Sequence, residues 1–133
     1  MDDKLTNKFQ KNFPVEKMQI DKLQELLNCE LPKDYTDFML SGNGGEGWIG
    51  ENSYLMLWRI EDILDLNDKY NIFDFAPGLL VFGSNGGIDA YAFDTRIEGI
   101  PIVNVPFIGM NLDEINYLGD TFEEFLEYLY KSN

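Results

Sequence analysis

The sequence contains no histidine, only one cysteine and no long apolar run. Without histidine the most common general base is missing, and neither a Ser-His-Asp triad nor a Cys-His pair can form. Cys29 has no second cysteine to pair with, so we interpret it as a buried thiol and not as a disulfide or zinc ligand. These features favour a protein without catalytic residues, a metal site or a cofactor.

The chain also lacks the segments that direct a protein into or across a membrane. No stretch approaches the roughly 20 apolar residues that span a bilayer. The charged residues 1–4 have no apolar run behind them that would serve as a signal peptide. We therefore expect a cytoplasmic protein.

Positive charge is scarce in most of the chain. The net charge is −14, and residues 36–133 contain 17 acidic residues but only four basic ones. Nucleic acids and anionic membranes are disfavoured as partners, because binding either one needs Lys or Arg to neutralise phosphate groups. A basic protein partner is favoured, although an acidic surface that serves only solubility has the same composition.

Core-forming residues are plentiful by contrast. Hydrophobic residues make up 44% and aromatic residues 14% of the 133 positions, which is too rich for a disordered chain. The length indicates one domain, residues 1–133, which can bury roughly two-thirds of the surface that its unfolded chain exposes. Nothing in the composition indicates an oligomeric state.

Apolar periodicity and turn residues predict the order of the elements. We expect helices over residues 16–28, 32–41, 59–66 and from Thr121 towards the C-terminal end, strands over residues 53–58, 79–84, 88–94 and 100–107, and a loop over residues 67–78. This order predicts an α+β fold: a mainly antiparallel twisted sheet of four to six strands, with N-terminal helices and a C-terminal helix packed against it.

Local signals refine three of these elements. Asn85-Gly86 lies between two apolar runs and predicts a hairpin with a type I′ turn, which needs positive φ at both central residues. Pro101 and Pro106 fit an edge strand or the ends of a strand. Thr121, followed three residues later by a glutamate, predicts a capping box for the last helix.

Residues 42–47, GNGGEG, match the G-x-G-x-x-G pattern of a dinucleotide-binding loop. Such a loop follows a strand and opens a helix whose N-terminal amides face the pyrophosphate. Here the segment follows a helix, and Glu46 within it would repel phosphate. We therefore interpret it as a turn that ends the helix and redirects the chain towards the sheet.

Acidic side chains are too numerous for their spacing to identify a catalytic or metal site. Residues 65–68 cluster oxygen ligands, but they lack the spacing and central glycine of a calcium loop. A pair among Asp89, Asp94 and Glu98 has the residue types of a glycosidase. With so many acids some pair lies close by chance, so a carboxylate-based hydrolase is only a remote alternative.

Residues 31–45, LPKDYTDFMLSGNGG, resemble the Leu-Pro, Tyr, Phe, Asn-Gly-Gly signature of the SUKH superfamily. The resemblance continues in order through residues 54–72, 75–94, 101–110 and 118–126. This superfamily groups fungal cell-wall-synthesis regulators with bacterial toxin-immunity proteins. Residues that match its motifs are interpreted as fold determinants: Leu31, Pro32, Tyr35, Phe38, Asn43, Gly44, Gly45, Gly83, Asn85, Gly86, Tyr91, Phe93 and Asp94.

The resemblance implies a domain that binds proteins and does not transform small molecules. We expect an immunity protein of a polymorphic toxin system, which neutralises a toxin, often a nuclease, by direct binding. A regulatory or scaffolding role in cell-envelope synthesis is the alternative. We select five candidate contact residues, four for their negative charge and Trp48 because Trp is frequent at binding hot spots. They are Glu46, Trp48, Glu51, Asp113 and Glu114.

Overall fold

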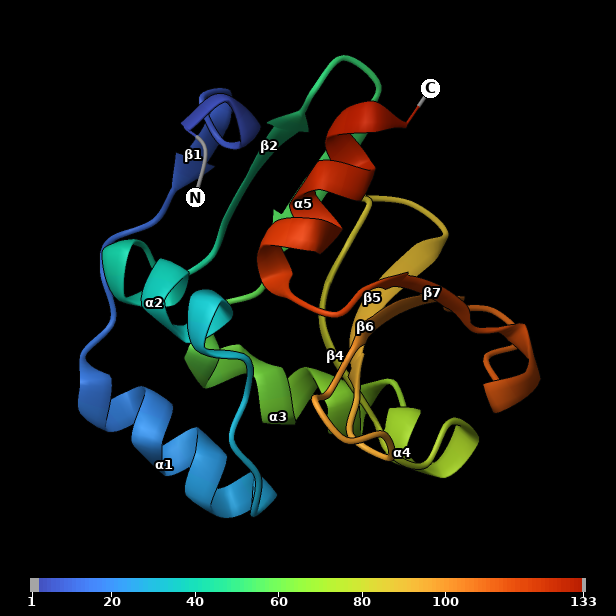
Figure 1. The fold of residues 1–133 in the computed structure, drawn as a ribbon. Coiled ribbons are helices and arrows are strands. Elements are labelled where there is room, and N and C mark those ends of the chain that lie inside the picture. The colour runs from blue at the N-terminus through green and yellow to red at the C-terminus, as the bar shows by residue number, and fades with distance from the viewer. Residues whose placement is uncertain (1–2, 133) are drawn as a thin grey trace.

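The computed structural model, which describes residues 3–132, contains one antiparallel sheet in which each strand pairs with the next along the chain (Figure 1). The strands are β1 (Phe9–Lys11), β2 (Gly45–Ile49), β3 (Ser53–Leu57), β4 (Leu79–Ser84), β5 (Asp89–Asp94), β6 (Ile102–Pro106) and β7 (Asn116–Gly119). The helices are η1 (Asp3–Leu5), α1 (Lys17–Leu27), α2 (Lys33–Ser41), α3 (Ile60–Lys69), α4 (Ile72–Phe75), η2 (Leu112–Glu114) and α5 (Phe122–Lys131).

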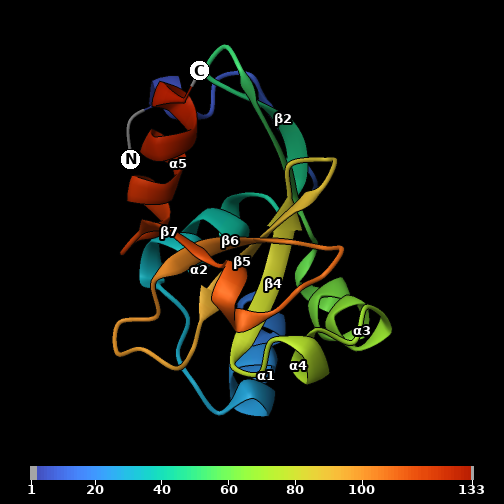
Figure 2. The same cartoon turned by 90° about the vertical axis from the view of Figure 1, so that its right-hand side faces the viewer.

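Hydrophobic side chains form two clusters, one on each face of the sheet. The larger cluster joins α1, α2, α3 and α5 to the inner face of strands β1–β7. The smaller cluster lies on the opposite, outer face, where Ile72 and Ala76 from the α4 region cover the middle of the sheet. Figure 2 shows α5 beside β2 in the upper part of the molecule, with α3 and α4 below β2.

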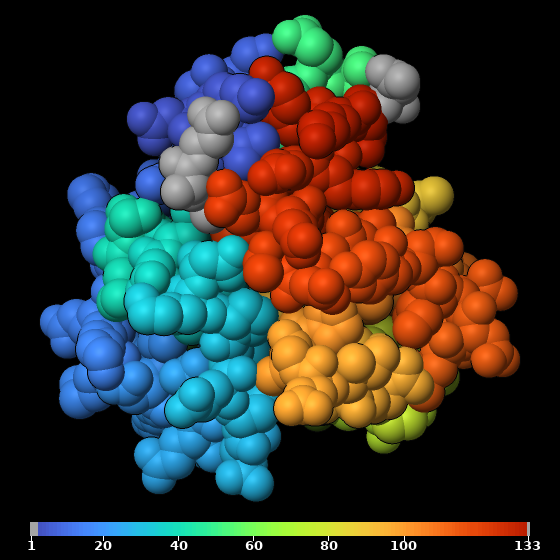
Figure 3. Space-filling model, viewed as in Figure 1, coloured from blue at the N-terminus to red at the C-terminus, as the bar shows by residue number. Residues whose placement is uncertain are grey.

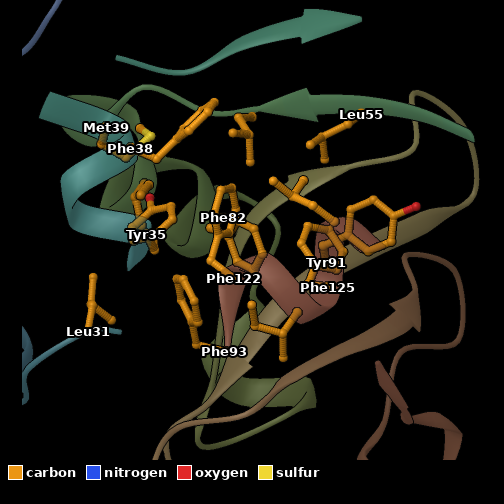
Figure 4. Packing of buried hydrophobic residues seen from close by; sticks show 14 of the residues in the cluster. Leu31, Tyr35, Phe38, Met39, Leu55, Phe82, Tyr91, Phe93, Phe122 and Phe125 are labelled. Atoms are coloured by element: carbon orange, nitrogen blue, oxygen red, sulfur yellow. The ribbon is translucent and has the colours of Figure 1, made fainter. Parts of the chain in front are cut away.

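Tyr35 is a buried member of the larger cluster (Figure 4). Its ring makes edge contacts with the rings of Phe82, Phe93 and Phe122, with centroids 5.6, 4.8 and 5.5 Å away. Aromatic pairs in this geometry contribute beyond the area they bury. The contacts bring α2, β4, β5 and α5 to one point.

The α+β class, the antiparallel sheet and the C-terminal helix are confirmed, but the expected four to six strands are wrong, because residues 3–132 contain seven. The additional strands are either short, as β1 and β7 are, or rich in glycine, as β2 is. Their sequences are FQK in β1, GEGWI in β2 and NYLG in β7. Pairing with a neighbour stabilises such segments where intrinsic propensity does not.

Two local predictions are also wrong. Residues 67–78 are not one loop, since Asn67 lies in α3 and a one-turn helix, α4, follows. Asn67 is fully buried, and its side chain bonds to the backbone N–H and C=O of Val81 in β4. The turn after β4 is not type I′, because Gly86 has positive φ but Asn85 does not. Instead, the Asn85 side chain accepts hydrogen bonds from Gly87 and Asp89 in a longer loop.

β6 is an interior strand, because it pairs with both β5 and β7. Its prolines are accommodated at the ends: Pro101 precedes the strand and Pro106 is its last residue. The alternative of strand ends was therefore the correct one.

Candidate partner-binding surface

Asn43 joins three segments just after α2. Its Oδ1 accepts a hydrogen bond from the backbone N–H of Ile60 at 2.8 Å, and its Nδ2 donates to the carboxylate of Glu61 at 2.6 Å. Both partners lie in the first turn of α3. Its backbone N–H donates to the carbonyl of Phe13. The hydrogen bond from Asn43 holds the pKa of Glu61 below its ordinary value. Asn43 thus fixes where the chain leaves α2 and enters β2.

Two glycines of β2 lie where the backbone of β1 passes close to the strand. A Cβ on Gly47 would lie 2.7 Å from the Cα of Phe9, and one on Gly45 would collide with the backbone carbonyl of Gln10. The backbone of β1 therefore excludes side chains at both positions. Glu46 lies between these glycines and Trp48 follows Gly47. Because side chains alternate along a strand, Glu46 and Trp48 lie on the outer face.

β3 adds two side chains to the same outer face. Leu55 and Leu57 point into the larger cluster, so Tyr54 and Met56 point outwards. Met56 lies opposite Glu46 and Tyr54 lies opposite Trp48. We call these four side chains (Glu46, Trp48, Tyr54 and Met56) the acidic-aromatic face. Among residues 3–132, no helix lies over this part of the sheet (Figure 2).

Two contacts hold the acidic-aromatic face in one arrangement. The rings of Trp48 and Tyr54 meet edge to face, with centroids 5.2 Å apart. The hydroxyl of Tyr54 donates a hydrogen bond to Oε2 of Glu46 at 2.6 Å. This hydrogen bond raises the pKa of Tyr54, because it stabilises the protonated hydroxyl beside a carboxylate. Trp48 nonetheless remains 48% exposed.

A surface hollow of about 300 Å³ adjoins Glu46 and Met56, with Gln10 and Trp58 among its other walls. Trp58 stacks on Tyr70, which in turn contacts Phe107. Aromatic rings therefore continue across the outer face from β3 towards the loop after β6.

The structure does not bring the five candidate contact residues together. Glu46 and Trp48 are neighbours on β2. Glu51 lies in the β2–β3 turn and pairs with Lys8 at 3.5 Å. Asp113 and Glu114 lie in η2, between β6 and β7, and four strands separate β2 from β7. Figure 3 shows the η2 segment protruding on the right, away from the β2–β3 turn at the top.

Comparison with known proteins identifies the family. The sequence model of the SMI1/KNR4 family (SUKH-1) matches residues 14–128. The chain belongs to the SUKH-1 family. A search of curated proteins gave no match.

The residues assigned to SUKH motifs lie mostly in the interior of this SUKH-1 domain. Most are buried or pack tightly against backbone: Leu31, Tyr35, Phe38, Asn43, Gly44, Gly45, Gly83, Tyr91, Phe93 and Asp94. Pro32 precedes α2, while Asn85 and Gly86 shape the turn after β4. The carboxylate of Asp94 is fully buried and accepts two hydrogen bonds from the Arg96 guanidinium, which lower its pKa.

Tyr54 and Met56 are the members of the surface that sequence reasoning missed. The segment SYLML alternates, with leucines at every second position, and this period predicts that Tyr54 and Met56 share the opposite face. The register that places them beside Glu46 and Trp48 depends on the β2–β3 pairing, and β2 itself was not predicted.

Other chemistry is sparse in the part of the SUKH-1 domain that the structure describes. No group of three or more His, Cys, Asp or Glu side chains within residues 3–132 is arranged to hold a metal ion. No helix in this range is long and apolar enough to span a membrane. A hollow of about 780 Å³ lies beside Asn43 and Phe13.

Proposed function

We propose that this protein is an immunity protein: it binds a bacterial toxin domain directly and thereby neutralises it. Membership of the SUKH-1 family carries the proposal. The resemblance noted above associates this superfamily with binding, both in toxin immunity and in regulation. The protein acts by occupying a surface of its partner and needs no catalytic residues of its own.

The charge of the molecule supports a basic partner. A net charge of −14 produces a negative potential that attracts basic proteins and increases their association rate. Nuclease toxins are basic where they hold phosphates. An acidic binding protein is therefore complementary to the part of such a toxin that it must cover.

The acidic-aromatic face supports a specific contact. The exposed Trp48 and the half-buried Tyr54 lie opposite each other on paired strands. Trp and Tyr supply contact area at a low entropic cost, and such residues dominate binding energy at interfaces. Trp48 and Tyr54 already support one another, so little ordering is needed on binding.

A regulatory or scaffolding role in cell-envelope synthesis is the second candidate, because the family includes such regulators. It differs in its partner and not in its mode of action. A toxin-like gene beside the gene for this protein would favour immunity.

Co-expression with such a neighbouring toxin tests the proposal. We expect cells that produce the toxin to stop growing, and growth to return when this protein is co-produced, with the two proteins purifying as a complex. A variant of this protein with a destabilised core provides the matched control. Failure both to rescue growth and to bind the toxin would contradict immunity to that toxin.

A further inference from the structure

The hollow beside Glu46 combines three features on one surface. Glu46 provides a carboxylate, Met56 and Trp58 provide apolar walls, and the open side of the hollow faces solvent. Tyr54 holds the carboxylate in place through its hydroxyl. Of the two carboxylate oxygens, Oε2 takes this hydrogen bond, and Oε1 accepts none from the other residues in the range 3–132.

Glu46 has no cationic partner within residues 3–132, although two lysines lie nearby. The ammonium group of Lys8 pairs with Glu51 at 3.5 Å. Lys11 is one of the residues that line the hollow, but its ammonium group is engaged on the α2 side, where it donates to Ser41 at 3.0 Å and lies over the ring of Phe38. The negative charge of Glu46 is therefore available to a partner.

We propose that this hollow receives an arginine side chain from the partner protein. The inference rests on the proposed function only for the existence of that partner. A guanidinium group donates in a planar fork that matches a carboxylate, and it stacks on aromatic faces. Its aliphatic stem packs on apolar surface while the charged head stays at the rim.

The geometry of the site favours arginine over other side chains. The carboxylate at the rim requires a donor of opposite charge, which excludes acidic residues and gives neutral ones no charge pairing. Trp58 lines the hollow, and Tyr54 lies beside the carboxylate that its hydroxyl binds. Cations bind aromatic rings at close range. Lysine shares the charge, but it lacks the planar fork and is more strongly hydrated.

An NMR titration of the isolated protein tests the proposal without the toxin. The probe is the capped tripeptide acetyl-Gly-Arg-Gly-amide, and the control is the same peptide with citrulline, a neutral isostere of arginine. We expect the arginine peptide to shift the indole resonance of Trp58, which lines the hollow, in a saturable way. The citrulline peptide should produce shifts at least about threefold smaller at equal concentration.

Two variants locate the effect. Glu46→Gln keeps the size and shape of the exposed side chain, and we expect it to weaken binding of the arginine peptide by about three- to tenfold. The double variant Asp113→Asn with Glu114→Gln removes more charge, but near the opposite edge of the sheet, and it should leave the shifts unchanged. Circular dichroism spectra of all three proteins should coincide.

Equal shifts with arginine and citrulline peptides would overturn the proposal, as would shifts that persist in Glu46→Gln or that disappear in the η2 variant. A lysine peptide that binds as tightly as the arginine peptide would overturn the choice of arginine. These outcomes concern the hollow alone. If they overturn the arginine proposal, growth rescue in co-expression can still succeed, so the two proposals are separately testable.

Discussion

Tyr35 places a hydroxyl within the aromatic core. The side chain is fully buried, and its oxygen has no hydrogen-bond partner among residues 3–132. Burial raises its pKa, because the apolar surroundings disfavour the phenolate. An unpartnered buried hydroxyl costs free energy that a phenylalanine would not.

We therefore expect Tyr35→Phe to leave the free energy of unfolding unchanged or to raise it by up to about 1 kcal/mol. Urea denaturation of the two proteins measures the difference. Tyr91→Phe is the control, because the hydroxyl of Tyr91 lies near the edge of the core (Figure 4) and is not an unpartnered buried group. A loss of more than about 1 kcal/mol in Tyr35→Phe would show that the hydroxyl has a stabilising partner.

The hydrogen bond between Tyr54 and Glu46 has a titration signature. Donation to the carboxylate favours the protonated form of Tyr54, so its pKa lies above the ordinary value. In Glu46→Gln the negative charge is absent, and the pKa of Tyr54 should fall towards that value. Following the Tyr54 ring resonances between pH 8 and about pH 12 measures the change. An unchanged pKa would mean that the two side chains do not interact in solution.

At the scale of elements, single polar side chains connect helices to their neighbours. The side chain of Asn43 accepts a hydrogen bond from the N–H of Ile60, the first residue of α3. The carboxylate of Asp34, in α2, accepts hydrogen bonds from the N–H groups of Phe122 and Glu123 at the start of α5. Helix N-termini leave such N–H groups without intrahelical partners. The helices are thus capped by residues far away in the sequence.

Asn43→Ala should lower the free energy of unfolding by about 2–3 kcal/mol, because it leaves Ile60 N–H unpaired and removes the contact with Glu61. Asn116→Ala, at an exposed position of the edge strand β7, is the matched control and should change it by less than about 0.5 kcal/mol. Urea denaturation midpoints provide the comparison. Equal effects in the two variants would contradict the structural role of Asn43.

The elements that the sequence predicted are those with a strong local signal. β4 and β5 are apolar runs on either side of a glycine turn, and Thr121 caps α5 through its hydroxyl as the motif predicts. The paired glutamate of that motif, Glu124, accepts from Asp120 N–H and not from Thr121. β1, β2 and β7 carry no comparable signal, because pairing and close backbone contact determine them.

The candidate surface was predictable only in part for the same reason. The position of Glu46 and Trp48 in a glycine-rich segment predicts that they are exposed. Their neighbours on the surface, Met56 and Tyr54, are determined by the register of β2 with β3. The acids of η2 were grouped with them by charge alone, and charge along a chain does not specify neighbours in space. The cap that Asp34 provides is equally non-local, since 88 residues separate it from Phe122.

At the scale of the whole molecule, charge governs encounters. The excess of acidic over basic residues extends over most of the chain, so the negative field surrounds the molecule as well as the acidic-aromatic face. Such fields increase association rates with basic partners, and salt screens them within about 8–10 Å at physiological ionic strength.

We therefore expect the association rate with a basic toxin to fall at least about tenfold between 50 mM and 500 mM NaCl, while the dissociation rate changes little. Stopped-flow fluorescence of the exposed Trp48 reports on the encounter. Reversing the charge of Asp113 and Glu114 together should slow association without accelerating dissociation. A rate that does not depend on salt would contradict steering, though not binding.

The most direct test of neutralisation by binding is a titration of toxin activity with purified protein. A toxin whose gene lies beside the gene for this protein would be held at a fixed concentration, well above the dissociation constant, and its activity measured as the protein is added. The proposed function predicts a linear loss of activity that ends at a fixed whole-number stoichiometry. Activity that persists in a large molar excess of folded protein would contradict it.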